Sequence, residues 1–187
     1  MGLGVVAVAE FLLVVTALAK LTAPAPAAGA LRSLGLRVPH HLVRIGAAAE
    51  LVAGAGALAS GWPVFAGLVA LWFAAFAAFI VVARRRPEAV TSCGCLSLPM
   101  GGSDRDTPPT VGHLVFDIAA AAVCLGAAVW PVPGVVTALG RQPMAGIPMI
   151  GLVVLGCWLS MILLTVAPQT ALAATTARTA RAAKNRA

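Results

Sequence analysis

Five long apolar segments constrain what this sequence can fold into. A helix of about 20 apolar residues crosses the roughly 30 Å hydrocarbon core of a bilayer, and helices satisfy their own backbone hydrogen bonds there. Charged residues make up 10% of the chain, against about a quarter in soluble domains. The sequence therefore predicts an all-α integral membrane protein with one transmembrane domain over residues 1–167. Its predicted spans are residues 3–21, 42–60, 62–83, 111–130 and 147–167.

Proline, glycine and charge define the connections between these spans. Pro24 and Pro26 end the first span because proline disrupts a helix, and a polar, basic loop is expected over residues 22–41. Gly61-Trp62-Pro63 is so short a link that spans two and three should form an antiparallel pair, and Thr110 is a plausible N-cap of span four. The remaining connections are expected to be a cysteine-containing loop, a Pro/Gly-rich link and a basic tail: residues 84–110, 131–146 and 168–187.

Lysine and arginine are distributed unevenly along the chain. With Lys20 and Arg44 at the helix ends, one side of the predicted membrane domain holds 12 of the 13 Lys and Arg residues, and the other side holds Arg141. The positive-inside rule then predicts a multi-pass plasma-membrane protein with its N-terminus outside and its cysteine loop and C-terminus in the cytoplasm. We attribute the charge to attraction for anionic lipid. The sequence lacks the basic folded surface with interspersed base readers that a nucleic-acid binder needs.

The Cys93-Gly94-Cys95 pair lies in the predicted loop, close to the Arg84-Arg85-Arg86 cluster. Nearby guanidinium groups favour the thiolate, which is both the nucleophile and the metal ligand. A disulfide across one residue closes a small strained ring, and strained, exposed disulfides are the labile ones. The two thiols could alternatively hold a soft ion such as Cu(I), with His113 or Met100 as a third ligand, although they are too few for structural zinc.

Three acidic residues lie inside predicted spans: Glu10, Glu50 and Asp117. A carboxylate at bilayer depth is costly unless it is paired or protonated, so each is a functional candidate. Gly46 and Gly54 lie four residues on either side of Glu50, on the same helical face. Because small residues permit close helix approach, we expect Glu50 to point into the bundle. It would either fix packing as a neutral hydrogen-bonding group or, like Glu10, handle a proton.

The other polar residues of the spans leave further alternatives open. Lys20, near the inner end of span one, is expected to snorkel to the surface in preference to pairing with Asp117. His113 lies one turn before Asp117 and could deprotonate a thiol or orient on that carboxylate, or be an ordinary helix-end histidine. Cys124 and Cys157 lie at similar depths, about 15–17 Å from the inner helix ends. They could form a second redox pair or be inert buried cysteines.

Short motifs in this chain resemble a known family. Ala19-Lys20-Leu21 at the end of the first helix, Glu50-Leu51 in the second and Cys93-Gly94-Cys95 after the third look like the methylamine-utilisation protein MauE, within the DoxX-like membrane proteins. Family members usually read Phe-Gly where this chain has Leu96 and Ser97. The resemblance covers roughly residues 1–130 and implies a DoxX-like four-helix transmembrane bundle, here with a fifth C-terminal helix added.

The resemblance also implies a function and its residues. The family is associated with thiol–disulfide metabolism, often alongside a thioredoxin-like partner. Cys93 and Cys95 would be the redox pair, with Lys20 and Glu50 as the family's intramembrane polar positions. We therefore expect a membrane component of an electron relay, with no cofactor, and a thiol–disulfide oxidoreductase if it is an enzyme. The alternatives are a non-catalytic subunit that anchors or assembles a larger complex with other membrane subunits, and a copper-handling protein.

Overall fold

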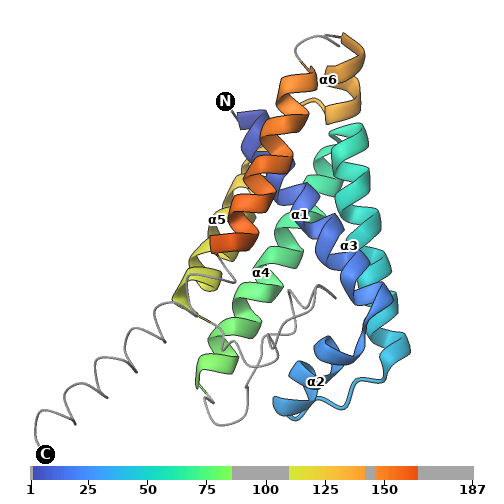
Figure 1. Cartoon of the computed structure of the whole chain (residues 1–187), viewed down its shortest axis with the longest axis vertical. Helices are drawn as coiled ribbons and strands as arrows, with labels where there is room; N and C mark the ends of the chain where they lie inside the picture. The colour runs from blue at the N-terminus through green and yellow to red at the C-terminus, as the bar shows by residue number, and fades with distance from the viewer. Residues whose placement is uncertain (1, 86–109, 142–145, 164–187) are drawn as a thin grey trace, which may run out of the picture.

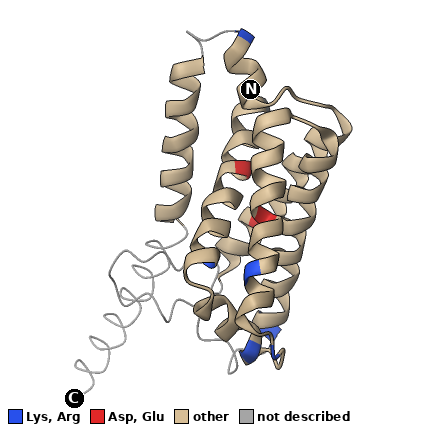
Figure 2. Ribbon diagram, turned by 90° about the vertical axis from the view of Figure 1, so that its right-hand side faces the viewer, with Lys and Arg blue, Asp and Glu red and all other residues tan. Residues whose placement is uncertain are grey.

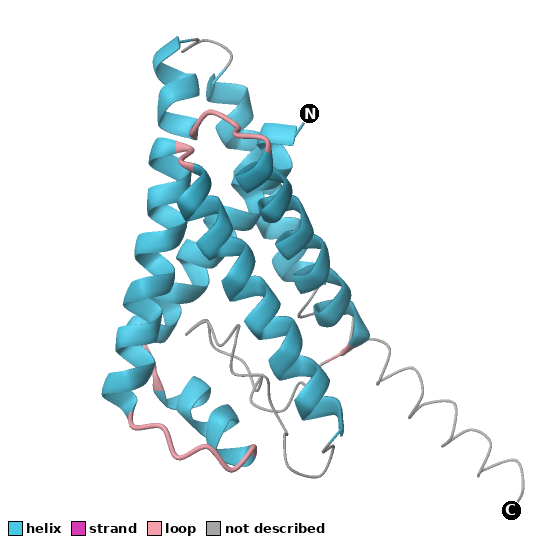
Figure 3. Cartoon of the chain, turned by 180° about the vertical axis from the view of Figure 1, so that it is seen from behind, coloured by secondary structure: helices cyan, strands magenta, loops and turns pink. Residues whose placement is uncertain are grey.

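The computed structural model describes residues 2–85, 110–141 and 146–163. These ranges are helical throughout apart from short connections, with no strand among them (Figure 3). A helix over Gly146–Leu163 follows the six helices labelled in Figure 1. In chain order, those six are α1 (Gly2–Thr22), α2 (Ala25–Ser33), α3 (His40–Ser60), α4 (Pro63–Arg85), α5 (Val111–Val129) and α6 (Val135–Arg141).

Within the described ranges, five helices are long and apolar enough to cross a membrane: α1, α3, α4, α5 and Gly146–Leu163. This finding confirms the all-α, multi-span fold predicted from the sequence. Large apolar side chains cover the outside of these helices, and Leu71, Ile118 and Leu152 are all exposed. Such a surface is suited to lipid, so the protein is a multi-pass membrane protein in contact with the bilayer.

The long helices run side by side along the longest axis of the molecule (Figure 1). The most extensive packing joins α4 to α5 and α1 to α3, and α3 also packs on α4. The helix over Gly146–Leu163 comes close to α1, since a Cβ added at Gly156 would lie 3.0 Å from a methyl group of Val8. The N-terminus and α6 lie at one end of the bundle, and α2 lies at the other.

The predicted antiparallel pairing of spans two and three is confirmed at Gly61. This residue caps α3 in the left-handed conformation (φ 65°), and its N–H donates to the Ala57 carbonyl at 2.9 Å. The α4 helix then begins at Pro63. A side chain at Gly61 would also collide with the backbone around Gly134, so glycine is needed here both for its conformation and for space.

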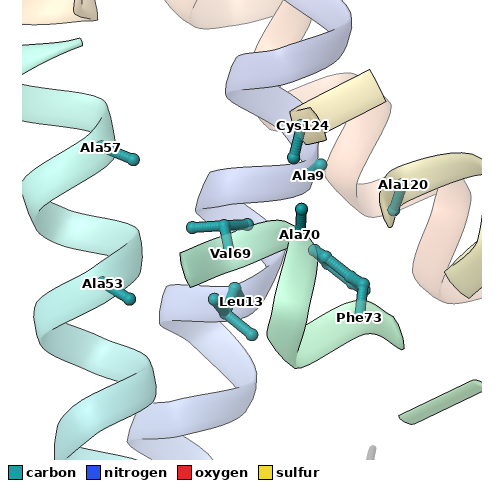
Figure 4. Close-up of a cluster of buried hydrophobic side chains, with 9 residues drawn as sticks. All are labelled: Ala9, Leu13, Ala53, Ala57, Val69, Ala70, Phe73, Ala120 and Cys124. Carbon is teal, nitrogen blue, oxygen red and sulfur yellow. The ribbon is translucent and has the colours of Figure 1, made fainter. Parts of the chain in front are cut away.

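Small residues dominate the core, which lies where α1, α3, α4 and α5 meet (Figure 4). In a membrane, where apolar burial gives little drive for helix association, small side chains let helices approach and gain van der Waals contact. Phe73 packs against the small side chains of this core and makes edge-to-face contacts with Phe76 and Phe116. The buried cluster consists of Ala9, Leu13, Ala53, Ala57, Val69, Ala70, Phe73, Ala120 and Cys124.

Two connections predicted as irregular contain short helices. The α2 helix lies within the expected loop 22–41, and α6 lies within the expected link 131–146. The prolines were interpreted only as the end of the first span, yet Pro24 and Pro26 also start α2. Proline is tolerated in the first helical turn, where its missing N–H would have no helical partner. The buried side chains of Ala28 and Ala30 then hold α2 to the bundle.

Candidate functional site

A buried ion pair joins α1 to α3 inside the bundle. The Nζ of Lys20 donates to both carboxylate oxygens of Glu50, at 2.7 Å and 2.9 Å. The two side chains are 9% and 5% exposed, respectively. Such a two-pronged, charge-assisted contact satisfies a carboxylate that would otherwise be very costly at this depth.

The expectation that Lys20 snorkels to the surface is therefore wrong. Side chains on a helix tilt toward its N-terminus, and α1 runs from the end that carries α6 toward the end that carries α2 (Figure 1). Lys20 lies in the last turn of α1, so its side chain points back into the bundle, toward Glu50 on α3. Snorkelling would have required the long side chain to turn against this direction.

Residues of α4 and α5 complete the surroundings of this pair. The Lys20 ammonium lies 4.2 Å from the centre of the Phe76 ring on α4, a distance at which the ring face attracts a cation. Asp117 on α5 is half-buried and is near enough to interact electrostatically with Lys20. Four helices thus contribute to a single polar centre, and the contact of Phe76 with Lys20 was not predicted from the sequence.

Glu50 points into the bundle, as the flanking glycines predicted, and its residue is 4% exposed. A Cβ added at Gly54 would lie 2.9 Å from a Val14 methyl group and 3.1 Å from the Glu10 carbonyl oxygen. Glycine at this position is therefore what allows α1 and α3 to approach closely enough for the ion pair. One signal in the sequence could have identified the pair, because a buried carboxylate needs a cation. Of the two cations within predicted spans, Lys20 and Arg44, Lys20 is the one on a different helix from Glu50.

His113 forms part of the start of α5. Thr110 caps the helix, as predicted: its hydroxyl accepts from the His113 N–H at 3.4 Å and lies 2.7 Å from the His113 Nδ1. The imidazole also accepts from the Thr110 N–H, which completes a reciprocal capping arrangement. Among the described residues, the partner that orients this buried ring is Thr110 and not Asp117, so the helix-end interpretation of His113 agrees with the geometry.

The cysteines divide into two groups. Cys124 on α5 and Cys157 on the last described helix are both buried free thiols, and Cys124 belongs to the core cluster of Figure 4. Cys93 and Cys95 lie outside the described residues, as does Met100. Within the described ranges, no group of three or more His, Cys, Asp and Glu side chains is arranged to hold a metal ion.

Glu10 is the third acidic residue of the bundle, after Glu50 and Asp117. It is 5% exposed, and no described residue forms an ion pair or hydrogen bond with its carboxyl group. The Cys124 thiol on α5 is near enough to interact electrostatically with the Glu10 carboxyl group. Among the described residues, Glu50 is thus the carboxylate with an ion pair, whereas Glu10 and Asp117 have none, and Asp117 differs from Glu10 in its electrostatic interaction with Lys20.

Comparison with known proteins identifies a family. Residues 2–132 match the family model described as Methylamine utilisation protein MauE. The match takes in α1 to α5, including the Lys20–Glu50 pair, and ends before α6. No curated protein and no solved structure matches the chain.

Proposed function

The chain belongs to the MauE family of methylamine-utilisation membrane proteins, and from this premise we propose that it is a membrane component of a thiol–disulfide redox system. In this proposal Cys93 and Cys95 exchange electrons with a thioredoxin-like partner. The main observation in support of this proposal is the Cys93-Gly94-Cys95 sequence, in a chain that resembles a family associated with thiol–disulfide metabolism.

The end of α4 supports this chemistry. The helix finishes with Arg84 and Arg85, both exposed, and the first cysteine follows eight residues later in the sequence. Guanidinium groups near a thiol stabilise the thiolate, which is the form that attacks a disulfide. A positive helix end would also attract a partner with an acidic surface.

The proposed reaction is a two-electron exchange. A thiolate of the Cys93/Cys95 pair attacks the disulfide of the partner, forms a mixed disulfide and releases one partner thiolate, which takes up a proton. The second cysteine of the pair then attacks the mixed disulfide and releases the other partner thiol. Cys93 and Cys95 end as a disulfide and the partner as a dithiol, and the reverse sequence reduces the pair again.

A redox titration tests the proposal. The protein would be equilibrated in glutathione buffers of defined potential, quenched with acid and alkylated with a mass-tagged thiol reagent. A Cys124→Ser, Cys157→Ser background leaves the loop pair as its only thiols. We expect a cooperative two-electron transition above about −300 mV, the upper range of structural disulfides. Thiols that stay reduced at every potential would contradict the proposal, and the Cys93→Ser, Cys95→Ser variant is the control for background tagging.

The Lys20–Glu50 pair favours a second candidate, a non-catalytic subunit that helps to assemble a larger membrane complex. A carboxylate satisfied by two bonds from one lysine acts as a packing element and has no free oxygen positioned for chemistry. The two candidates are distinguished by the Cys93→Ser, Cys95→Ser variant in cells. An assembly subunit keeps its function in this variant, and a thiol relay loses it.

A further inference from the structure

A small cavity lies toward the end of the bundle that carries the N-terminus and α6, opposite the end where most of the described Lys and Arg residues lie (Figure 2). Its volume is about 10 Å³, and its walls include Glu10, Ala57, Ala66, Ala127 and the Pro133–Gly134 segment. These residues belong to α1, α3, α4, the end of α5 and the connection that follows it. A cavity of this volume has room for about one water molecule.

Glu10 is the one ionisable side chain among the residues that line this cavity. Every fully buried side-chain nitrogen or oxygen in the described part of the protein has a hydrogen-bond partner. The Glu10 carboxyl oxygens have no such partner among the described residues, so each must retain some accessible surface. Glu10 is one of the residues that line the cavity, so we assign the accessible surface of its carboxyl group to this space.

The surroundings of Glu10 give it no compensating charge. The α3 and α4 residues that line the cavity, Ala57 and Ala66, are apolar. From α5, the ionisable group near enough to interact with it is the Cys124 thiol. Lys20, which lies on the same helix as Glu10, already forms an ion pair with Glu50. An unpaired carboxylate is strongly disfavoured in an apolar interior, so the stable form of Glu10 is the protonated acid.

We propose that Glu10 is a proton-binding site, which exchanges its proton through the water-sized cavity with the side of the membrane on which α6 lies. A hydronium ion delivered to the cavity gives its proton to the carboxylate and leaves as water, and release is the reverse. The proposal needs no redox step and does not depend on the role of Cys93 and Cys95. It separates the two glutamates, because Glu50 is held as an anion by Lys20 and Glu10 is free to change protonation state.

Infrared spectroscopy of the purified protein in phospholipid vesicles tests the assignment. A protonated carboxyl group gives a C=O stretching band that shifts when the proton is exchanged for deuterium. We expect such a band in wild type, its loss in Glu10→Gln, and its retention in Asp117→Asn. A band that persists in Glu10→Gln and disappears in Asp117→Asn would overturn the assignment to Glu10.

The access route has its own test. Ala127→Val adds two methyl groups to the cavity wall and leaves too little room for a water molecule, so the carboxyl band should exchange with deuterium about tenfold more slowly. Ala120→Val makes the same change in α5 at a member of the core cluster that does not line the cavity, and should leave the exchange rate unchanged. Equal slowing in both variants, or no slowing in Ala127→Val, would overturn the route.

A chemical measurement avoids reliance on any variant. Dicyclohexylcarbodiimide is an apolar reagent that modifies protonated carboxyl groups in membrane interiors, and mass spectrometry of wild-type peptides locates the product. We expect modification at Glu10 to exceed that at Glu50 by about tenfold, because a lysine at 2.7 Å keeps Glu50 ionised. Modification of Glu50 in preference to Glu10 would contradict the proposal.

Discussion

At the scale of single residues, the Lys20–Glu50 pair is the most consequential contact in the bundle. Both groups are buried, and their bonds are short. Such a pair adds little to the stability of the folded protein compared with an apolar replacement of the same shape, because the cost of desolvating both charges offsets most of their attraction. Its importance lies in the cost of breaking it, since either partner alone is an uncompensated charge in an apolar interior.

Removal of one charge should therefore destabilise the protein more than removal of both. We expect Lys20→Met and Glu50→Gln each to lower the free energy of unfolding by about 3–5 kcal/mol, and the double variant to recover a large part of that loss. Reversible unfolding of detergent-solubilised protein, followed by circular dichroism, measures the three values. Strict additivity of the two single effects would show that the pair is not coupled.

The sequence predicted only part of this site, for a geometric reason. Glycines on the helical face of Glu50 were enough to predict that the carboxylate points inward. The partner was not predicted because the reach of Lys20 depends on the direction in which its side chain leaves α1 and on the axial offset between α1 and α3. Neither quantity is encoded in residue spacing along one helix.

At the scale of helices, the crossing of α1 and α3 depends on the absence of a side chain at Gly54. An alanine there would place its Cβ 3.1 Å from the Glu10 carbonyl oxygen, and a backbone atom cannot turn aside as a side chain can. The same crossing brings Lys20 and Glu50 together, so helix packing and the ion pair are linked.

We expect Gly54→Ala to lower the free energy of unfolding by about 1–3 kcal/mol, as overpacking does in other cores. The matched control is Gly126→Ala in α5, where an added Cβ meets no atom within 4 Å. The control should be neutral or more stable by up to about 1 kcal/mol, because alanine favours the helix. If both variants changed stability equally and in the same direction, the proposed helix contact would not be the cause.

The start of α5 gives a further prediction. Thr110→Ala removes the hydroxyl that accepts from His113 and should cost about 1 kcal/mol of stability. Thr110→Ser retains the hydroxyl and should restore most of the loss. Thermal unfolding of the two variants beside wild type gives the comparison, and equal losses in both would rule out the cap as the cause.

The helices themselves were predictable to different extents. Long apolar runs identify membrane spans because the bilayer imposes one minimum length on all of them. The short helices α2 and α6 have no such external constraint. Proline, glycine and arginine in residues 22–41 resemble loop composition, and α2 depends on tertiary burial of Ala28 and Ala30, which no local pattern encodes.

At the scale of the whole molecule, charge divides the bundle into two unlike ends. Of the Lys and Arg residues that the structure describes, Arg141 lies at the end with α6, and the others lie toward the opposite end (Figure 2). The same distribution in the full sequence predicts that the basic end faces the cytoplasm. On this prediction Glu10 would lie in the outer half of the bilayer, and Arg85 and Thr110, the described residues before and after the segment with Cys93 and Cys95, would lie toward the inner half (Figure 1).

Labelling with a membrane-impermeant maleimide tests this orientation in intact cells. In the Cys124→Ser, Cys157→Ser background, we expect Cys93 and Cys95 to react only after lysis, and to require prior reduction if the pair is a disulfide at rest. The control places one thiol at the other end by Trp62→Cys, at a residue 66% exposed in the α3–α4 turn, after all four native cysteines are changed to serine. That thiol should react in intact cells. The reverse pattern would invert the topology and place Cys93 and Cys95 outside, where the proposed exchange would involve extracytoplasmic partners, with the proposed proton route of Glu10 opening to the cytoplasm.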